Sequence, residues 1–224
     1  MANVHLILVA GGIGSRMKAN KPKQLLLLNK KPVFVYALEK FFNVYPKINV
    51  VVAAHAESKI EIQKNIKKYF KNANVTIIEG GPTRFHSVKN ALAAIKDKGI
   101  IAVHDAARPL VSGETIKRTF ETAKRKGNAI PAIAVSESVR VLKNNISKAI
   151  DRDTLRIIQT PQCFDADLLR KAYKSAKGSK FTDDASVIEK LGLKINLVEG
   201  NKENLKITEP DDLIKAAALL KYVK

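Results

Sequence analysis

The sequence predicts an α/β protein in which helices cover both faces of a mostly parallel sheet. Short apolar runs alternate along the 224 residues with segments of helical spacing. The apolar runs are continuous, which indicates strands that are buried on both faces. Strands of this kind, separated by helices, are typical of a parallel sheet covered on both sides. We expect a single domain over residues 1–224, because this length supplies an ample core and no repeat or linker interrupts it.

The expected elements follow one another in order. Strands are expected at residues 6–10, 48–54, 75–79, 100–105 and 129–135. Helices are expected between them at residues 33–42, 57–70, 83–96 and 112–127. Pro32 suits the start of the first helix because its φ is preset, and Ser112 and Gly127 suit the two ends of the last one. The apolar spacing of the second helix is set by Ile60, Ile66 and Phe70.

The C-terminal third continues the same pattern. A helix begun by Asp165 is expected at residues 165–176, and a helix capped by Thr182 is expected at residues 182–192. Two more strands are expected, at residues 193–200 and 204–210. The last helix, at residues 210–222, has Pro210 at its start and acidic residues in its first turn, which suits the helix dipole.

Residues 136–160 break this rhythm. Apolar and polar residues alternate around an Asn144-Asn145 turn, which predicts an extended β-hairpin. Two strands alone are only marginally stable in water. The hairpin should therefore pack on something else, most simply on a second copy of the chain, as an inserted and protruding dimerisation arm. The alternative is a hairpin that lies on the edge of its own sheet.

The first strand ends in a glycine-rich loop followed by cations, within residues 6–26. The dinucleotide-binding fingerprint needs a third glycine where this chain has Met17, and the Walker loop needs a Gly-Lys-Ser/Thr triplet that does not follow. The nucleotidyltransferase loop, A-G-G-x-G-x-R and then P-K, is filled at every place from Ala10 to Lys23. Backbone N–H groups and cations in this arrangement predict a polyphosphate site. Arg16 and Lys23 are the residues expected to carry the chemistry.

Charge and composition bear on the other classes of function. A formal charge of +19 can indicate nucleic-acid binding, so a basic nucleic-acid-binding protein stays the alternative class. The lysines are scattered, however, and no aromatic-studded motif for base stacking accompanies them, so we expect no nucleic-acid partner. We expect no membrane partner either, since no apolar segment is long enough to span a bilayer and no secretion leader is seen. The single Cys163 fits a reducing cytoplasm.

Six separated motifs carry a family resemblance. In order they are AGGIGSRM with PKQ, EGGPTRFHSV, VHDAARP, DRDTLRIIQTPQ, TDDAS, and NLKIT with PDDL. Together they resemble the 2-C-methyl-D-erythritol 4-phosphate cytidylyltransferases, transferases of the non-mevalonate isoprenoid pathway that use CTP and release pyrophosphate. The resemblance spans residues 6–220. It implies a modified nucleotide-binding sheet, Rossmann-like and of the nucleotidyltransferase type, in a homodimer joined through the arm.

The resemblance also implies roles for individual residues. Arg16 and Lys23 resemble the pair that stabilises negative charge in the transition state, and Arg152 and Lys206 resemble the residues that position the polyol phosphate. Further contacts to that substrate are implied at Thr160 and Thr182, and, from the arm side or the partner chain, at Ser138 and Arg108. Contacts to CTP are implied at Ala10, Gly11, Gly12, Gly81 and Ser87.

Asp105 ends an apolar strand, where α/β folds place ligand-facing groups. It is expected to support a Mg²⁺ or another divalent cation bridging the triphosphate, directly or through water. The alternative is a carboxylate that pairs with Arg108. The neighbouring His104 is expected to be a packed, hydrogen-bonding residue without a catalytic role. One departure from the family pattern is Pro82, which stands where an acidic residue is frequent.

The related ribitol 5-phosphate cytidylyltransferases share the loop, the chemistry and the arm, and they are the alternative within enzymes. The VHDAARP motif is of the methylerythritol type, with two alanines before Arg108. Small side chains there leave room for the branching methyl group of methylerythritol. The expected acceptor is therefore the methylerythritol phosphate.

Overall fold

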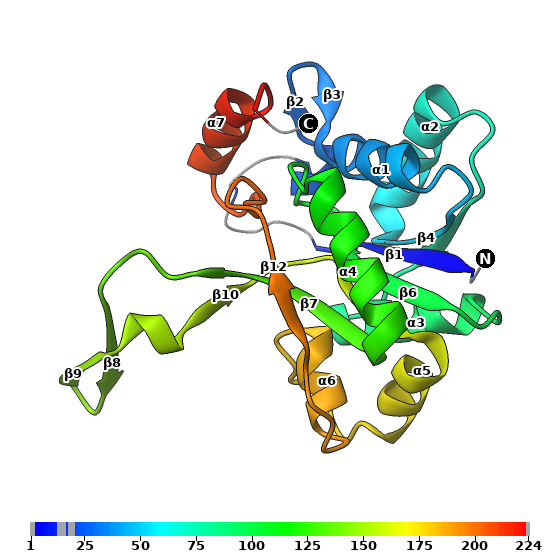
Figure 1. The fold of residues 1–224 in the computed structure, drawn as a ribbon. Helices are drawn as coiled ribbons and strands as arrows, with labels where there is room; N and C mark the ends of the chain where they lie inside the picture. The colour runs from blue at the N-terminus through cyan, green and yellow to red at the C-terminus, as the bar shows by residue number, and fades with distance from the viewer. Residues whose placement is uncertain (1–2, 13–16, 18–20, 223–224) are drawn as a thin grey trace.

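The computed structural model describes residues 3–12, 17 and 21–222. Within these residues, its centre is an eight-stranded sheet (Figure 1). Seven of the strands follow the order β10-β7-β11-β6-β1-β4-β5, and the eighth, β12, pairs with β7. The strands are β1 (Val4–Ala10), β4 (Asn49–Ala54), β5 (Val75–Glu79), β6 (Ile100–Asp105), β7 (Asn128–Ala134), β10 (Arg156–Ile158), β11 (Gln162–Asp165) and β12 (Leu197–Glu199).

Pairing within the sheet is mostly parallel, as predicted. β1 runs parallel to both of its neighbours, β4 and β6, and β4 runs parallel to β5. β11 is inserted between β6 and β7 and is antiparallel to both. The sequence analysis missed β10 and β11, because strands of three and four residues are too short for a periodic signal. The carboxyl ends of the four parallel strands meet at one edge of the sheet.

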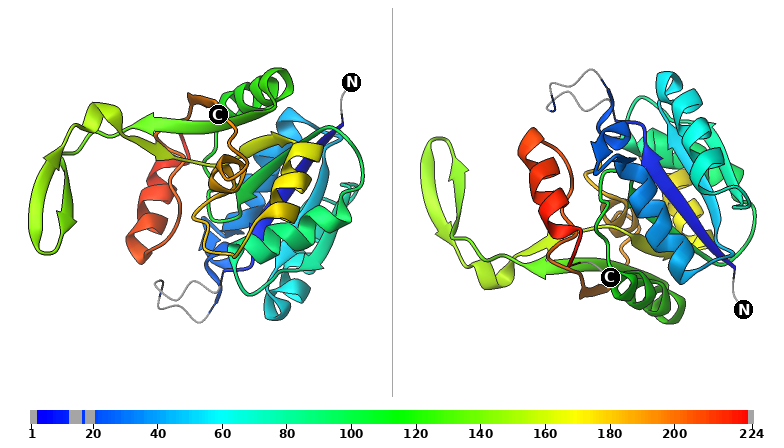
Figure 2. Two further views of the ribbon diagram at one scale, coloured as in Figure 1. Left: turned by 90° about the horizontal axis from the view of Figure 1, so that it is seen from below. Right: turned by 90° about the horizontal axis from the view of Figure 1, so that it is seen from above.

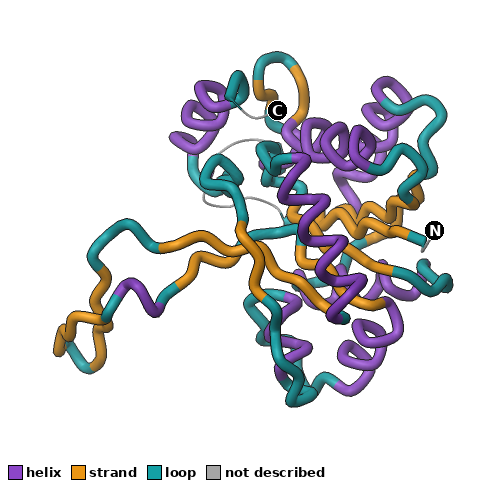
Figure 3. The backbone as a smooth tube through the Cα atoms, in the orientation of Figure 1, coloured by secondary structure: helices purple, strands orange, loops and turns teal. Residues whose placement is uncertain are grey.

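Helices bury both faces of the sheet, as predicted (Figures 2 and 3). They are α1 (Val33–Val44), α2 (Lys59–Tyr69), α3 (Arg84–Ala94), α4 (Gly113–Lys126), α5 (Ala166–Ser175), α6 (Asp184–Glu189) and α7 (Pro210–Leu219). Leu6 and Leu8 of β1 share a core with α1, α2 and α4, whereas Ile7 shares a core with α3, α5 and α6. Among the residues described, no helix combines the length and apolar character needed to cross a membrane.

Local signals at helix ends are largely confirmed. At α4, the Ser112 hydroxyl accepts from a backbone N–H of the first turn, and Gly127 ends the helix with φ 82°. Asp165 caps α5 in the same way. At α6 the prediction was wrong by one residue, since the cap is Asp183 and not Thr182. Carboxylate and hydroxyl oxygens both suit this position, so the sequence alone did not separate the two.

Two further expectations were wrong. In α2, Ile60 is 68% exposed, and the buried residues are Ile62 and Ile66, one turn apart. The strand expected at residues 204–210 is absent, since residues 204–209 are irregular and α7 begins at Pro210. A small hairpin that the sequence analysis did not anticipate, β2 (Leu27–Leu28) and β3 (Lys31–Pro32), precedes α1.

The interval 136–160 contains the predicted hairpin. β8 (Val139–Lys143) and β9 (Ile146–Ile150) pair antiparallel in a sheet of their own. Asn144 and Asn145 have φ values of 48° and 62°, as a two-residue hairpin turn requires. The hairpin projects away from the central sheet (Figure 1) and is followed by a 3-10 helix, η4 (Arg152–Thr154). The alternative of a hairpin on the edge of its own sheet is therefore wrong.

Candidate active site

A cavity of about 630 Å³ lies at the carboxyl ends of the parallel strands, where open α/β sheets place their ligands. Its walls come from the glycine turn after β1, the turn between β5 and α3, the end of β6 and the segment before α7. The predicted site residues that line it are Gly11, Gly12, Lys23, Gly81, Ser87, Asp105 and Lys206. Folding thus brings together residues from opposite ends of the chain. Ala10 is buried behind this wall, at the end of β1.

The glycines at the cavity have different tasks. A Cβ on Gly81 would overlap the Cβ of His86, and a Cβ on Gly11 would lie 3.1 Å from the Ser87 hydroxyl oxygen. That hydroxyl accepts a hydrogen bond from the Gly81 N–H at 3.0 Å. At Gly12, no described atom lies within 4 Å of an added Cβ. Gly11 and Gly81 therefore allow close packing of the wall, whereas Gly12 leaves space for a ligand.

Lys23 reaches the cavity because its neighbour Gln24 is anchored. The Gln24 side chain is buried and donates from Nε2 to the Ala10 carbonyl oxygen at 2.7 Å. This bond ties the 3-10 helix η2 (Lys23–Leu25) to the end of β1. The sequence analysis named the PKQ motif without giving Gln24 a task. Arg16, the other predicted catalytic cation of this loop, lies outside the described residues.

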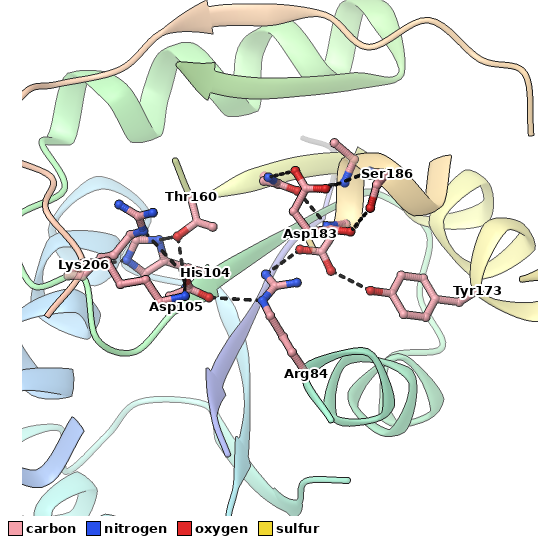
Figure 4. A network of polar contacts seen from close by, with 12 residues as sticks. Arg84, His104, Asp105, Thr160, Tyr173, Asp183, Ser186 and Lys206 are labelled. Atoms are coloured by element: carbon pink, nitrogen blue, oxygen red, sulfur yellow. Dashed lines mark hydrogen bonds and ion pairs between the residues drawn. The ribbon is translucent and has the colours of Figure 1, made fainter. Parts of the chain in front are cut away.

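Asp105 ends β6 amid three cations (Figure 4). Its Oδ2 lies 2.9 Å from Lys206 Nζ and 3.5 Å from Arg108 Nε, and its Oδ1 lies 3.3 Å from Arg84 Nε. Burial alone would raise the pKa of this carboxyl, but the charges of Arg84, Lys206 and Arg108 outweigh burial and hold the pKa well below its usual range. The pairing of Asp105 with Arg108 is therefore present, together with two partners that the sequence analysis did not foresee.

The segment before α7 places Lys206 beside Asp105. The Ile207 N–H donates to the backbone carbonyl that precedes Arg108, at 2.8 Å. Arg108 in turn donates from Nη1 to the Asn204 carbonyl at 2.7 Å. These bonds hold residues 204–207 along the chain that leaves β6, and the Lys206 ammonium meets the buried carboxylate as a result.

His104 and Thr160 form an internal chain of hydrogen bonds. His104 is fully buried, and burial lowers its pKa to about 4, so the ring is neutral near pH 7. Its Nε2 lies 3.1 Å from the Arg108 carbonyl, which can only accept, so Nδ1 accepts from the Thr160 hydroxyl at 3.0 Å. The Thr160 oxygen accepts from the Asp105 N–H at 3.1 Å. His104 is thus the packed, hydrogen-bonding residue that was predicted, and the Thr160 hydroxyl is engaged within the chain.

Arg84 links the cavity to the buried start of α6 (Figure 4). Its Nη2 donates to Asp184 Oδ2 at 2.7 Å, while its Nε donates to Asp105. The other oxygen of Asp184 accepts from the Tyr173 hydroxyl at 2.6 Å. Burial alone would lower the pKa of Arg84, but the charges of Asp184 and Asp105 outweigh it and raise the pKa. Sequence reasoning missed this cluster, because no local pattern signals a contact across 100 residues.

Besides Ala10, five of the predicted residues that the structure describes do not line the cavity. Arg108 and Thr160 contact Asp105 instead. Arg152 and Ser138 are exposed on the arm, where Arg152 Nη1 donates to the Ser136 carbonyl at 2.7 Å. Thr182 is exposed just before α6. Within a single chain, the arm residues are therefore not brought to Lys206 and Asp105.

The cavity fits a divalent cation only together with a substrate. Among the described ranges, no three His, Cys, Asp or Glu residues cluster in a way that could hold a metal ion. Two carboxylates, Asp105 and Glu79, line the cavity. Mg²⁺ is commonly held by one or two carboxylates plus substrate phosphates and water. Both oxygens of Asp105 already face cations, so the residues present fit a Mg²⁺ held mainly by the phosphates of a substrate.

The fold, the glycine turn and the cations of the cavity define a nucleotide-binding α/β protein of the nucleotidyltransferase class. A profile of the 2-C-methyl-D-erythritol 4-phosphate cytidylyltransferase family matches residues 4–222. The chain belongs to this family, and the resemblance found in the sequence motifs is confirmed.

Relatives of the same name cover nearly the whole chain. The enzyme from Bacteroides fragilis is 43% identical over 214 residues, which are 96% of this chain and 98% of that protein. The crystal structure from Thermus thermophilus has a TM-score of 0.79 at 32% identity and covers 99% of this chain and 100% of that one. The bifunctional IspDF from Campylobacter jejuni has a TM-score of 0.80 at 34% identity over 96% of this chain, which spans only 54% of that longer protein.

Proposed function

We propose that this chain transfers the cytidylyl group of CTP to 2-C-methyl-D-erythritol 4-phosphate. An oxygen of the acceptor phosphate forms the bond to the α-phosphorus of CTP, the bond to the β-phosphate breaks, and pyrophosphate leaves with the electron pair. The observation that carries the proposal is one cavity in which Lys23, Lys206 and the glycine turn meet, in a chain of this family. The product is CDP-methylerythritol, an intermediate of isoprenoid biosynthesis.

Fixed positive charge supplies the catalysis in this proposal. In-line attack spreads negative charge over the oxygens of the α-phosphate, and preorganised cations lower that barrier. Lys23 acts from the wall of the cavity, and Arg16 is the second cation expected there. The acceptor phosphate is ionised at neutral pH, so its oxygen attacks without a general base. The engagement of His104 in internal hydrogen bonds is consistent with this reaction.

The glycine turn is proposed to bind CTP through the backbone. Gly12 leaves its backbone open to CTP, because an added Cβ there would meet no described atom, whereas Ala10, Gly11 and Gly81 serve this binding through the close packing of the wall. The Ser87 hydroxyl, already bonded to Gly81, holds the wall in place. A wall fitted to a pyrimidine rejects the larger purines.

A pyrophosphate-release assay over a small matrix of substrates tests this proposal. Each of the four ribonucleoside triphosphates is paired with methylerythritol phosphate, ribitol phosphate or no acceptor, with pyrophosphatase added. Turnover that requires both CTP and a polyol phosphate is the expected result. Release without an acceptor, or with a purine nucleotide as the preferred donor, would contradict the proposal.

Removal of divalent cations should abolish turnover. We propose Mg²⁺, or another divalent cation, as the cofactor, held mainly by the phosphates of CTP and supported by Asp105 directly or through water. When bound, the ion offsets the charge of the triphosphate. Chelation with EDTA is expected to lower the rate of pyrophosphate release by at least about a hundredfold, and added Mg²⁺ should restore it. Full turnover in excess chelator would exclude this cofactor.

The acceptor preference should be real but finite. Ala106 and Ala107 at the end of β6 are buried and have small side chains, so this part of the site leaves room for the branching methyl group of methylerythritol. One methyl group in an apolar pocket contributes about 1–3 kcal/mol, so kcat/KM is expected to favour methylerythritol phosphate over ribitol phosphate by at least about tenfold. Competition between the two acceptors at one CTP concentration measures the ratio. An equal or reversed preference would assign the protein to ribitol phosphate.

The assembly and the location are also proposals. We propose a homodimer in which the arm of one chain completes the acceptor site of the other, since Arg152 and Ser138 lie outside their own cavity.

A cytoplasmic location is supported by the single Cys163, which is buried as a free thiol. We propose no nucleic-acid or membrane partner, and salt-dependent binding to duplex DNA would contradict the first of these.

A further inference from the structure

We propose that Asp184 and Tyr173 are positioning residues that act through Arg84 on the charges of the active site. The inference rests on the cytidylyltransferase reaction proposed above. The contacts run from Tyr173 on α5 to Asp184 at the start of α6, then to Arg84 at the start of α3 and to Asp105 at the end of β6 (Figure 4). Only the last two of these residues line the cavity.

Asp184 is the firmer of the two anchors of Arg84. The guanidinium lies 2.7 Å from Asp184 but 3.3 Å from Asp105. Asp184 is completely buried, its second oxygen is bound by the Tyr173 hydroxyl, and its N–H donates to Gln162 Oε1 at 3.0 Å. Side chain and backbone of this aspartate are thus both fixed. A guanidinium held by such a partner presents its charge to the cavity in one orientation.

By holding Arg84, Asp184 also affects which cation lies closest to the Asp105 carboxylate. Arg84 and Lys206 both pair with the Asp105 carboxylate. While Asp184 engages the guanidinium, Lys206 keeps the shorter contact with Asp105, at 2.9 Å. Without Asp184, Arg84 would move toward Asp105 or toward the triphosphate, because it lines the cavity and would lose its closest counter-charge. The CTP would then bind more tightly in the ground state, while the charges needed in the transition state would be displaced.

The first test is Asp184→Asn, which keeps the shape and removes the charge. We expect kcat to fall by at least about tenfold and KM for CTP to fall by about twofold or more at low ionic strength. A purely structural defect reduces the amount of active enzyme and gives no tighter CTP binding. An unchanged kcat, or a KM for CTP that rises, would overturn the inference.

A double-mutant cycle tests whether Asp184 acts through Arg84. Arg84→Gln alone is expected to lower kcat/KM, because Arg84 lines the cavity. Adding Asp184→Asn to that variant should change kcat and KM by less than about twofold, since the Arg84 guanidinium through which Asp184 acts is already absent. The double variant should also melt at a higher temperature than Asp184→Asn, because no guanidinium is left without its closest counter-charge. Independent, multiplicative effects on kcat would show that Asp184 works by another route.

Tyr173→Phe separates geometry from charge and serves if Asp184→Asn folds poorly. The ring keeps its stacking on Phe85, at 4.7 Å between centroids, and only the hydroxyl is lost. With the Asp184 charge retained, we expect KM for CTP to stay constant and kcat, expressed per folded enzyme, to fall by about two- to fivefold. The matched control is Asp165→Asn on the start of the same helix, where asparagine caps equally well and activity should be unchanged.

The wild-type enzyme, measured alongside, separates the two levels of inference. If the wild type shows no turnover with CTP and a polyol phosphate, the proposed function fails. The other case is a wild type that turns over, a Tyr173→Phe variant as active as Asp165→Asn, and independent effects of Arg84→Gln and Asp184→Asn in the double-mutant cycle. The proposed reaction then stands, and the positioning role of Asp184 and Tyr173 is refuted.

Discussion

Replacing Lys23 by alanine is expected to lower kcat by about a hundredfold or more, because loss of one preorganised charge contact in a transition state costs about 3 kcal/mol. Lys23 lines the cavity from η2, and the buried Gln24 side chain that ties η2 to the Ala10 carbonyl is unchanged by the substitution. The fold should therefore survive the substitution, with a melting temperature close to that of the wild type. Pyrophosphate release at saturating CTP and acceptor, together with a thermal melt, measures both outcomes.

Lys21→Ala is the matched control. Lys21 lies two residues earlier, is exposed, and forms a surface ion pair with Glu61 at 3.0 Å. Exposed pairs of this kind contribute little, so this variant should keep its turnover and its stability. Arg16→Ala is expected to resemble Lys23→Ala, as the sequence motif assigns both to the same task. Near-normal turnover of Lys23→Ala at saturating CTP would remove the central cation from the proposal.

Patterns that act over a few residues were predicted well from the sequence. Ser112 and Gly127 were placed correctly because a helix cap depends on only three or four neighbouring residues. The Asn144-Asn145 turn was found because few residues accept positive φ. The error at Ile60 was one of spacing, since Ile60 and Ile66 are six residues apart and lie on different faces of a helix, whereas Ile62 and Ile66 are four apart and share one. The apolar spacing therefore favoured Ile62 as the buried residue.

Contacts between distant parts of the chain could not be predicted in this way. β11 is a strand because β6 and β7 flank it, not because of its own four residues. The partners of Asp105 come from α3, from the turn after β6 and from the segment before α7, so a sequence pattern at Asp105 could indicate a site but not its counter-ions. Motif resemblance identified Lys23 and Lys206, which the fold then brought to one cavity.

Two inactive chains should complement each other if the arm of one serves the cavity of the other. The first chain carries Lys23→Ala and keeps its arm intact. The second carries Arg152→Ala with Ser138→Ala and keeps its cavity intact. In a two-fold symmetric dimer, the hybrid holds one site with both parts intact and one site with both parts altered, so about half of the wild-type turnover is expected.

Co-expression with two different affinity tags yields the hybrid free of the parent dimers. The control hybrid pairs a Lys23→Ala chain with a Lys206→Ala chain. Lys23 and Lys206 of one chain line the same cavity, so in this hybrid each of the two cavities lacks one lysine. That hybrid should remain inactive, since an intact arm does not replace a missing cavity lysine. An arm shared between chains would be contradicted if the control hybrid were active or if the first hybrid were inactive. It would also be contradicted if light scattering showed a monomer and that monomer were fully active. Complementation in the first hybrid alone would assign Arg152 and Ser138 to the acceptor site of the partner chain.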